Sequence, residues 1–199
     1  MEQGEILIGN VNVKDIATEQ LMDLVSFVFQ DTFLFYDTLY ENIAVGSSKA
    51  TRDTVIAAAR AAQCHEFIEK LPNGYETRIG DKGVFLSSGE AQRVCVARAI
   101  LKNAPILVLD EATAFADPEN EYKMQQALKS LIKDKTVIII AHRLSSIVSS
   151  DRIIVLKDGR AVQCGRHEEL SSQEGVYKKM WNAYTSAFRW QLNVKQEKE

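Results

Sequence analysis

The chain has 199 residues, enough for one domain with a hydrophobic core, or for one domain and a small lobe. Hydrophobic residues make up 46% of the chain and charged residues 26%, a globular composition that argues against disorder. The net charge is −3 at pH 7 and the basic residues are dispersed, so charge gives no support for nucleic-acid binding.

The first third of the chain predicts a hairpin, a strand and then helices. Residues 5–13 alternate apolar and polar side chains around Gly9 and Asn10, which favours a strand or a hairpin. Residues 19–24 predict a short helical turn, and the Val- and Phe-rich segment 24–30 predicts a buried strand ending at Gln30. The alanine-rich segment 51–64 predicts a helix that continues over 66–71 until Pro-Asn-Gly breaks the chain.

The remainder alternates helices and strands. Ser87 or Ser88 is a good N-cap for a helix over residues 90–102. After it the pattern predicts strands at 106–110, 136–141 and 153–157, helices at 118–133, 144–148, 167–170 and 175–191, and a hairpin partner at 161–165. Strands that alternate with helices favour an α/β fold, with a parallel sheet covered on both faces.

Residues 86–111 combine two features that suit a phosphate and a metal ion. The sequence LSSGE opens a helix, and free backbone N–H groups at the positive end of a helix attract an anion. Twenty residues later the apolar strand ILVL ends on Asp110 and Glu111. Acids at the tip of a buried strand can bind a metal ion and act as a general base. This segment therefore predicts a nucleotide site with phosphate and magnesium.

The same segment resembles the signature and Walker B sequences of ATP-binding cassette (ABC) ATPases. LSSGE corresponds to LSGGQ, with Ser88 in place of a glycine and Glu90 in place of glutamine. The resemblance implies a P-loop NTPase (RecA-like) α/β fold with a parallel sheet and a helical signature subdomain. Residues 1–30 and 103–199 would then form part of the RecA-like core, and 31–102 the helical subdomain.

Three other short sequences match the family in the same order along the chain. Gln30 resembles the Q-loop glutamine, and His142 in AHRLS resembles the H-loop histidine. Asp117 closes AFAD where the D-loop normally reads SALD, so Phe115 departs from the family at the dimer interface.

The resemblance assigns a role to each of these residues. Glu111 and His142 would be catalytic, and Asp110 and Gln30 would bind Mg²⁺. The residues implied to contact the nucleotide, ATP, are Gln30, Ser87, Ser88, Gly89, Glu90 and Asp117.

Two loops resemble the parts of exporter-type ABC half-transporters that contact the membrane domain. One is VFQDTFLFYDTLYENI, in which Phe33 and Phe35 could otherwise be core aromatics, and the other is GDKG at residues 80–83. The implied partners are a transmembrane domain and a second nucleotide-binding domain in a head-to-tail dimer, and no nucleic acid.

The sequence contains no G-x-x-x-x-G-K-[ST] phosphate loop. We therefore expect a domain truncated at its N-terminus before the Q-loop, inactive alone, that offers its signature to ATP held by a partner. One alternative is a non-catalytic fragment or decayed gene product. Another is a soluble ABC ATPase of DNA repair or translation, although the coupling-type loop argues against it.

Cysteine usage and hydropathy bear on where the chain resides. Cys64, Cys95 and Cys164 are widely spaced with no C-x-x-C pair, which favours a reducing compartment over a disulfide framework. No apolar run reaches the roughly 18–20 residues that cross a bilayer. We expect a soluble chain on the cytoplasmic side of the cell membrane, held there by its membrane-domain partner.

Overall fold

The computed structural model describes residues 4–80, 83–110, 118–141 and 143–196. The chain divides into two compact units, Met1–Ile140 and Ala141–Glu199, each of which has its own hydrophobic core.

The first unit begins with a small hairpin. Strands β1 (Leu7–Ile8) and β2 (Val11–Asn12) pair antiparallel, with positive φ angles at Gly9 and Asn10 in the turn. The short 3-10 helix η1 (Val13–Asp15) and helix α1 (Thr18–Leu24) lead to the sheet. The predicted hairpin and helical turn are confirmed.

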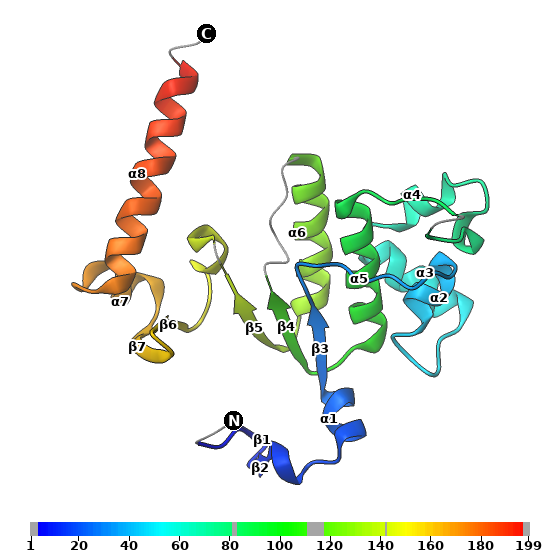
Figure 1. Ribbon diagram of the computed structural model, residues 1–199, viewed down its shortest axis with the longest axis horizontal. Coiled ribbons are helices and arrows are strands. Elements are labelled where there is room, and N and C mark those ends of the chain that lie inside the picture. The colour runs from blue at the N-terminus through cyan, green and yellow to red at the C-terminus, as the bar shows by residue number, and fades with distance from the viewer. Residues whose placement is uncertain (1–3, 81–82, 111–117, 142, 197–199) are drawn as a thin grey trace. The chain divides into compact units, whose positions relative to one another are not determined.

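A three-stranded parallel sheet organises this unit, in the order β3-β4-β5 (Figure 1). The strands are β3 (Val25–Val28), β4 (Ile106–Asp110) and β5 (Thr136–Ile140). The register pairs Val28 with Leu109 and Asp110 with Ile140, so the three strands end at the same edge. The predicted parallel α/β fold is confirmed.

Helix α5 (Ser88–Lys102) packs against this sheet at β3. The other helices of the unit gather around α5 and around one another, and they are α2 (Leu39–Ala44), α3 (Arg52–Ala61), α4 (His65–Glu69), η2 (Gly74–Glu76) and α6 (Pro118–Ile132). Helix α5 is central, because it contacts β3, α6, α2 and α3 (Figure 1). The core between them includes Val28, Leu107 and Leu109 from the strands and Val94 and Ala97 from α5.

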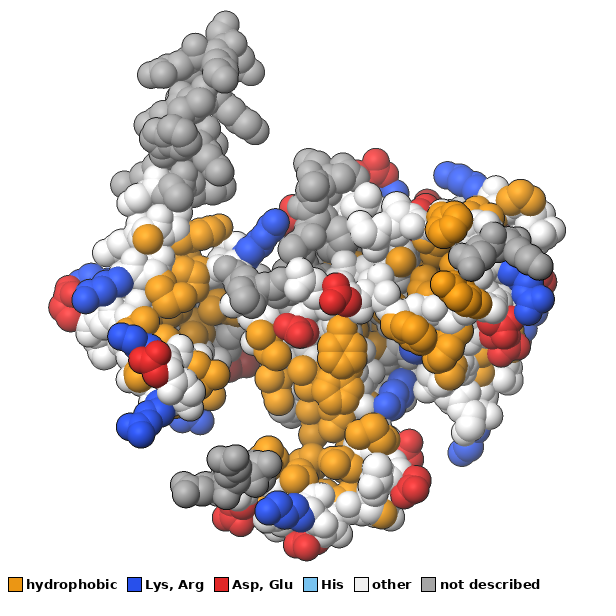
Figure 2. All heavy atoms as spheres, in the orientation of Figure 1, with side chains coloured by type: hydrophobic (Ala, Val, Ile, Leu, Met, Phe, Trp, Pro, Cys, Tyr) orange, Lys and Arg blue, Asp and Glu red, His pale blue; other side chains and the backbone are white. Residues whose placement is uncertain are grey.

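The other face of the sheet carries exposed apolar side chains, so the prediction of a sheet covered on both faces is wrong for the described residues. Phe27 and Phe29 stack with ring centroids 5.5 Å apart, and Ile138 and Ile140 follow the same two-residue spacing on β5. Figure 2 shows hydrophobic side chains gathered over the strands.

The second unit is built on a hairpin of β6 (Ile153–Lys157) and β7 (Arg160–Gly165), with η3 (Leu144–Ile147), α7 (His167–Ser172) and α8 (Val176–Gln196). Its core contains Leu144, Ile153, Val155, Leu170 and Tyr177. The phenol oxygen of Tyr177 lies 2.8 Å from Nδ1 of His167.

Strand β3 ends at Val28 and not at Gln30 as predicted, and two helical details also differ from the prediction. Helix α2 was not expected, and the segment 51–71 is two helices, because α3 ends at Ala61 and Gln63 takes a positive φ of 57°. Among the described residues, no helix combines the length and apolar character needed to span a membrane.

Candidate functional site

The parallel sheet brings two predicted metal-binding residues to one edge. Asp110 is the last residue of β4 and is half-buried, while Gln30 is exposed two residues beyond the end of β3. Because β3 and β4 are hydrogen-bonded neighbours in parallel register, both side chains belong to the carboxyl edge, where ligands of such sheets gather. A carboxylate and an amide offer oxygen donors of the kind that Mg²⁺ prefers.

The signature segment begins helix α5 with a capping box. Ser87 is the N-cap, and its Oγ accepts a hydrogen bond from the N–H of Glu90 at 3.3 Å. In return, a carboxylate oxygen of Glu90 accepts from the backbone N–H of Ser87 at 2.9 Å and lies 2.8 Å from its hydroxyl. This reciprocal pair fixes where the helix starts. It also places a negative charge beside the N–H groups predicted to receive phosphate.

Gly89 permits a close approach between the starts of α5 and α6. A Cβ at this position would lie 3.1 Å from Cγ of Asn120 in the first turn of α6. Nη1 of Arg93, one turn further along α5, donates to Oδ1 of the same asparagine at 2.7 Å. The signature segment is therefore joined to the segment that follows the predicted D-loop.

The described parts of the two predicted membrane-domain loops lie side by side, while residues 81 and 82 of the second loop lie outside the described residues. The N–H of Leu39 donates to the carbonyl of Thr77, and the N–H of Ile79 donates to that of Asp37, both at 3.0 Å. A Cβ on Gly80, whose φ is +113°, would overlap the ring of Tyr36. Segments 36–39 and 77–80 therefore form one surface.

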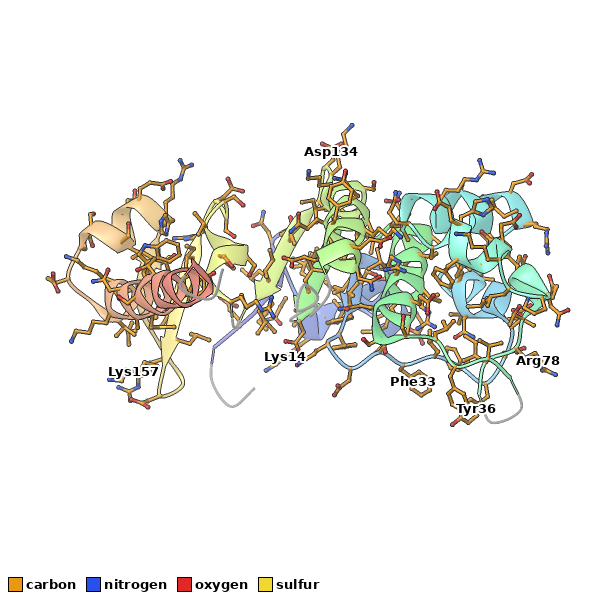
Figure 3. The ribbon with its side chains drawn as sticks, turned by 90° about the horizontal axis from the view of Figure 1, so that it is seen from above. Lys14, Phe33, Tyr36, Arg78, Asp134 and Lys157 are labelled. Carbon is orange, nitrogen blue, oxygen red and sulfur yellow. The ribbon has the colours of Figure 1, made fainter. Side chains whose placement is uncertain are left out.

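That surface exposes large aromatic side chains. Phe33 is 66% exposed and Tyr36 77%. Phe85, which is 79% exposed, follows Val84, and Val84 forms a β-bridge with Ile79 of the same surface. Phe33, Tyr36 and Arg78 lie along the same edge of the molecule in Figure 3. Exposed aromatic groups of this size are typical of contact surfaces.

A buried polar network holds the phenylalanine-rich loop in place. The side chain of Asn42 is fully buried, accepts from the N–H of Phe35 at 2.8 Å and donates to the carbonyls of Phe35 and Thr38. Arg98 of α5 donates to the Asn42 carbonyl at 2.8 Å and to the Phe33 carbonyl at 3.2 Å. Burial lowers the pKa of the Arg98 guanidinium. Helix α5 thus carries the signature segment at its start and, about three turns later, Arg98, which holds the phenylalanine-rich loop.

Sequence reasoning did not identify Asn42 or Arg98. The signal was present, because Thr38 and Glu41 have the T-x-x-E spacing of a helix start, and Thr38 caps α2 by accepting from the N–H of Glu41 at 3.1 Å. Three predicted site residues, Glu111, Asp117 and His142, lie outside the described residues.

The sequence of this chain is similar to the sequences of known transporters. The sequence profile described as ABC transporter matches residues 1–114. The chain is 49% identical over 182 residues to an ATP-dependent lipid A-core flippase of Methylobacillus flagellatus, covering 91% of this chain and 31% of the flippase. It is 46% identical over 178 residues to a Bacillus subtilis (strain 168) protein whose name includes the words multidrug export ATP-binding/permease protein, covering 89% and 31%.

A solved structure agrees with these sequences. The chain is similar to a bacterial Atm1-family ABC exporter with ATP bound, with a TM-score of 0.84 and 41% identity, over 92% of this chain and 32% of the exporter chain. This chain therefore spans about a third of the length of the proteins it resembles.

Proposed function

Since this chain belongs to the ABC transporter family, we propose that it is part of a nucleotide-binding domain that couples ATP hydrolysis to export across a membrane. The observation that supports this most directly is the shared carboxyl edge of β3 and β4, to which Gln30 and Asp110 belong. Residues 1–30 and 103–199 would belong to the RecA-like core and residues 31–102 to the helical subdomain.

In this proposal the predicted site residues bind Mg²⁺, accept a proton from water or contact the phosphate. Asp110 and Gln30 would hold Mg²⁺, which when bound neutralises charge on the phosphates of ATP. Glu111, directly after β4, would accept a proton from the attacking water, and His142 would hydrogen-bond the terminal phosphate.

The start of α5 would serve a different nucleotide. The N–H groups of Ser88 and Gly89 have no acceptor within the helix, because they belong to its first turn. They would donate to the terminal phosphate of ATP held by a second nucleotide-binding domain in a head-to-tail dimer, together with Ser87, Glu90 and Asp117. The aromatic surface of Phe33, Tyr36 and Phe85 would contact a transmembrane domain, which would hold the chain on the cytoplasmic side of the membrane.

The proposal is tested by preceding the chain with the phosphate-loop segment of a relative and measuring steady-state ATP hydrolysis in the presence of Mg²⁺. Glu111→Gln is expected to lower turnover at least about 100-fold, since general-base groups contribute on that order. Glu121→Gln, at a carboxylate in the first turn of α6 to which no role in the site is assigned, is the matched control and should retain activity. Equal turnover by the Glu111→Gln variant would contradict the catalytic assignment.

A further inference from the structure

A polar hollow of about 360 Å³ lies in the first unit, among α3, α4, α5 and α6. Its lining includes Arg60, His65, Glu66, Lys70, Arg93 and Lys123. Neither Gln30 nor any residue of the signature segment 86–90 lines it. The hollow is therefore separate from the site proposed for ATP.

Positive charge dominates this hollow. Lys123 pairs with Glu119 at 2.6 Å, whereas Arg60, Lys70 and Arg93 form no ion pair with any described residue. The lining therefore contains four cations, Arg60, Lys70, Arg93 and Lys123, and one carboxylate, Glu66. Two further carboxylates act on these cations, because Glu119 pairs with Lys123 and the charges of Glu90 and Glu119 raise the pKa of Arg93. This concentration stands out in a chain whose net charge is −3. A concave surface with one sign of charge focuses its field and attracts the opposite ion.

Arg93 is the deepest of these cations and is incompletely paired. Its residue is only 4% exposed, and its Nε has no hydrogen-bond partner within the described part of the chain. The contacts it does make are neutral, namely the amide oxygen of Asn120 at 2.7 Å and the ring of Phe67 with its centroid 5.5 Å away. Burial lowers the pKa of Arg93, and the charges of Glu90 and Glu119 only oppose that effect. Since burying a cation is costly, a bound anion would stabilise this arrangement further.

We infer that this hollow binds a small phosphate compound at a site distinct from the signature segment and from the carboxyl edge of the sheet. Arginine and lysine side chains donate charge-assisted hydrogen bonds to phosphate oxygens. Gln63, which also lines the hollow, adds a neutral donor. The volume lies within the range of roughly 300–1,000 Å³ that small-molecule sites occupy. The inference does not depend on the proposed function.

The test is calorimetric titration of the 199-residue chain with inorganic pyrophosphate at low ionic strength, without ATP or Mg²⁺. We expect saturable one-to-one binding. Arg60 and Lys70 are both exposed. The variant Arg60→Gln with Lys70→Gln should weaken binding about tenfold, because each exposed charge contributes up to about 1 kcal/mol and a tenfold change in Kd corresponds to about 1.4 kcal/mol. The charge-matched control is Lys49→Gln with Lys133→Gln, at exposed positions outside the hollow, and its affinity should be unchanged.

A second measurement locates the ligand. In ¹H–¹⁵N spectra, pyrophosphate should shift the Nε–H resonance of Arg93 and the amides around Gln63 and His65. Shifts centred on the amides of Ser88–Glu90 would mean that the phosphate sits at the start of α5, and the inference would be wrong. Absence of saturable binding, or equal weakening in the control variant, would also overturn it.

Discussion

At the scale of single residues, Arg98 is the clearest case of a side chain that positions a functional loop. Its guanidinium joins α5 to the carbonyls of Phe33 and Asn42, and lies 5.4 Å from the ring centroid of Phe35. Lysine cannot reproduce this forked geometry. We expect Arg98→Lys to lower the free energy of unfolding by about 2 kcal/mol, because charged hydrogen bonds to one partly buried and one exposed backbone carbonyl are lost.

Urea denaturation measures that change. Arg52→Lys is the matched control, since Arg52 is an exposed arginine that pairs with Glu76 at 2.8 Å. Its loss should stay within about 1 kcal/mol, as for other exposed ion pairs. Hydrogen exchange gives a second view: the amide of Phe35 should exchange faster in Arg98→Lys. If both variants lose the same free energy of unfolding, the hydrogen bonds of Arg98 do not hold the loop more strongly than an exposed ion pair would.

The buried thiol of Cys64 should make the free energy of unfolding depend on pH in the alkaline range. Burial raises the pKa of this thiol to about 12 from 9.0. Above pH 9 the unfolded chain loses the proton that the folded chain keeps, so the stabilising contribution, complete below pH 9, is lost as the pH rises toward 12. The slope is about 1.4 kcal/mol per pH unit within that window.

Comparison with Cys64→Ala isolates this effect from other groups that titrate at high pH. Denaturation of both proteins at pH 8 and pH 10 should show the native chain losing about 1.4 kcal/mol more than the variant. Parallel losses in the two proteins would assign the pH dependence to other residues.

At the scale of elements, the packing of α2 against α5 depends on Gly46. A Cβ on this residue would lie 2.5 Å from the backbone carbonyl oxygen of Arg98, and backbone cannot move aside as a flexible side chain can. We expect Gly46→Ala to cost about 1–3 kcal/mol of folding free energy, as overpacking does. Lys49→Ala, at an exposed position three residues away, should change stability by less than about 0.5 kcal/mol. Thermal unfolding of the two variants separates these outcomes.

Strongly patterned elements were predictable from the sequence, whereas elements held by tertiary contacts were not. Strands β4 and β6 begin and end where their apolar runs predict. Helix α2 has only six residues and little periodicity, and the buried side chain of Asn42 anchors it. An isolated helix of that length is unstable, so the contacts with Arg98 and Phe35 determine it.

In the candidate site, too, one part could be predicted from the sequence and another part depends on tertiary contacts. That Gln30 and Asp110 share an edge could be predicted, because parallel strands end together and both residues follow apolar runs. The polar hollow lined by Arg93 could not be predicted, because its lining residues come from different helices, and no local sequence pattern encodes how these helices pack together.

At the scale of the whole molecule, the two units have separate hydrophobic cores, which predicts that they lose structure independently. Tyr177 is 1% exposed and anchors the smaller core through packing and its contact with His167. We expect Tyr177→Ala to remove about 3–5 kcal/mol from the second unit, as large-to-small core substitutions of aromatic residues do.

Native-state hydrogen exchange resolves the two units in one experiment. In Tyr177→Ala, amides of β6 and β7 should lose protection, while those of β4 and α5 keep the values of the unsubstituted chain. Tyr177→Phe is the conservative control, because it removes only the hydroxyl that contacts His167 and should lose much less. A uniform loss of protection across β4, α5, β6 and β7 would show instead that the chain unfolds as one cooperative unit.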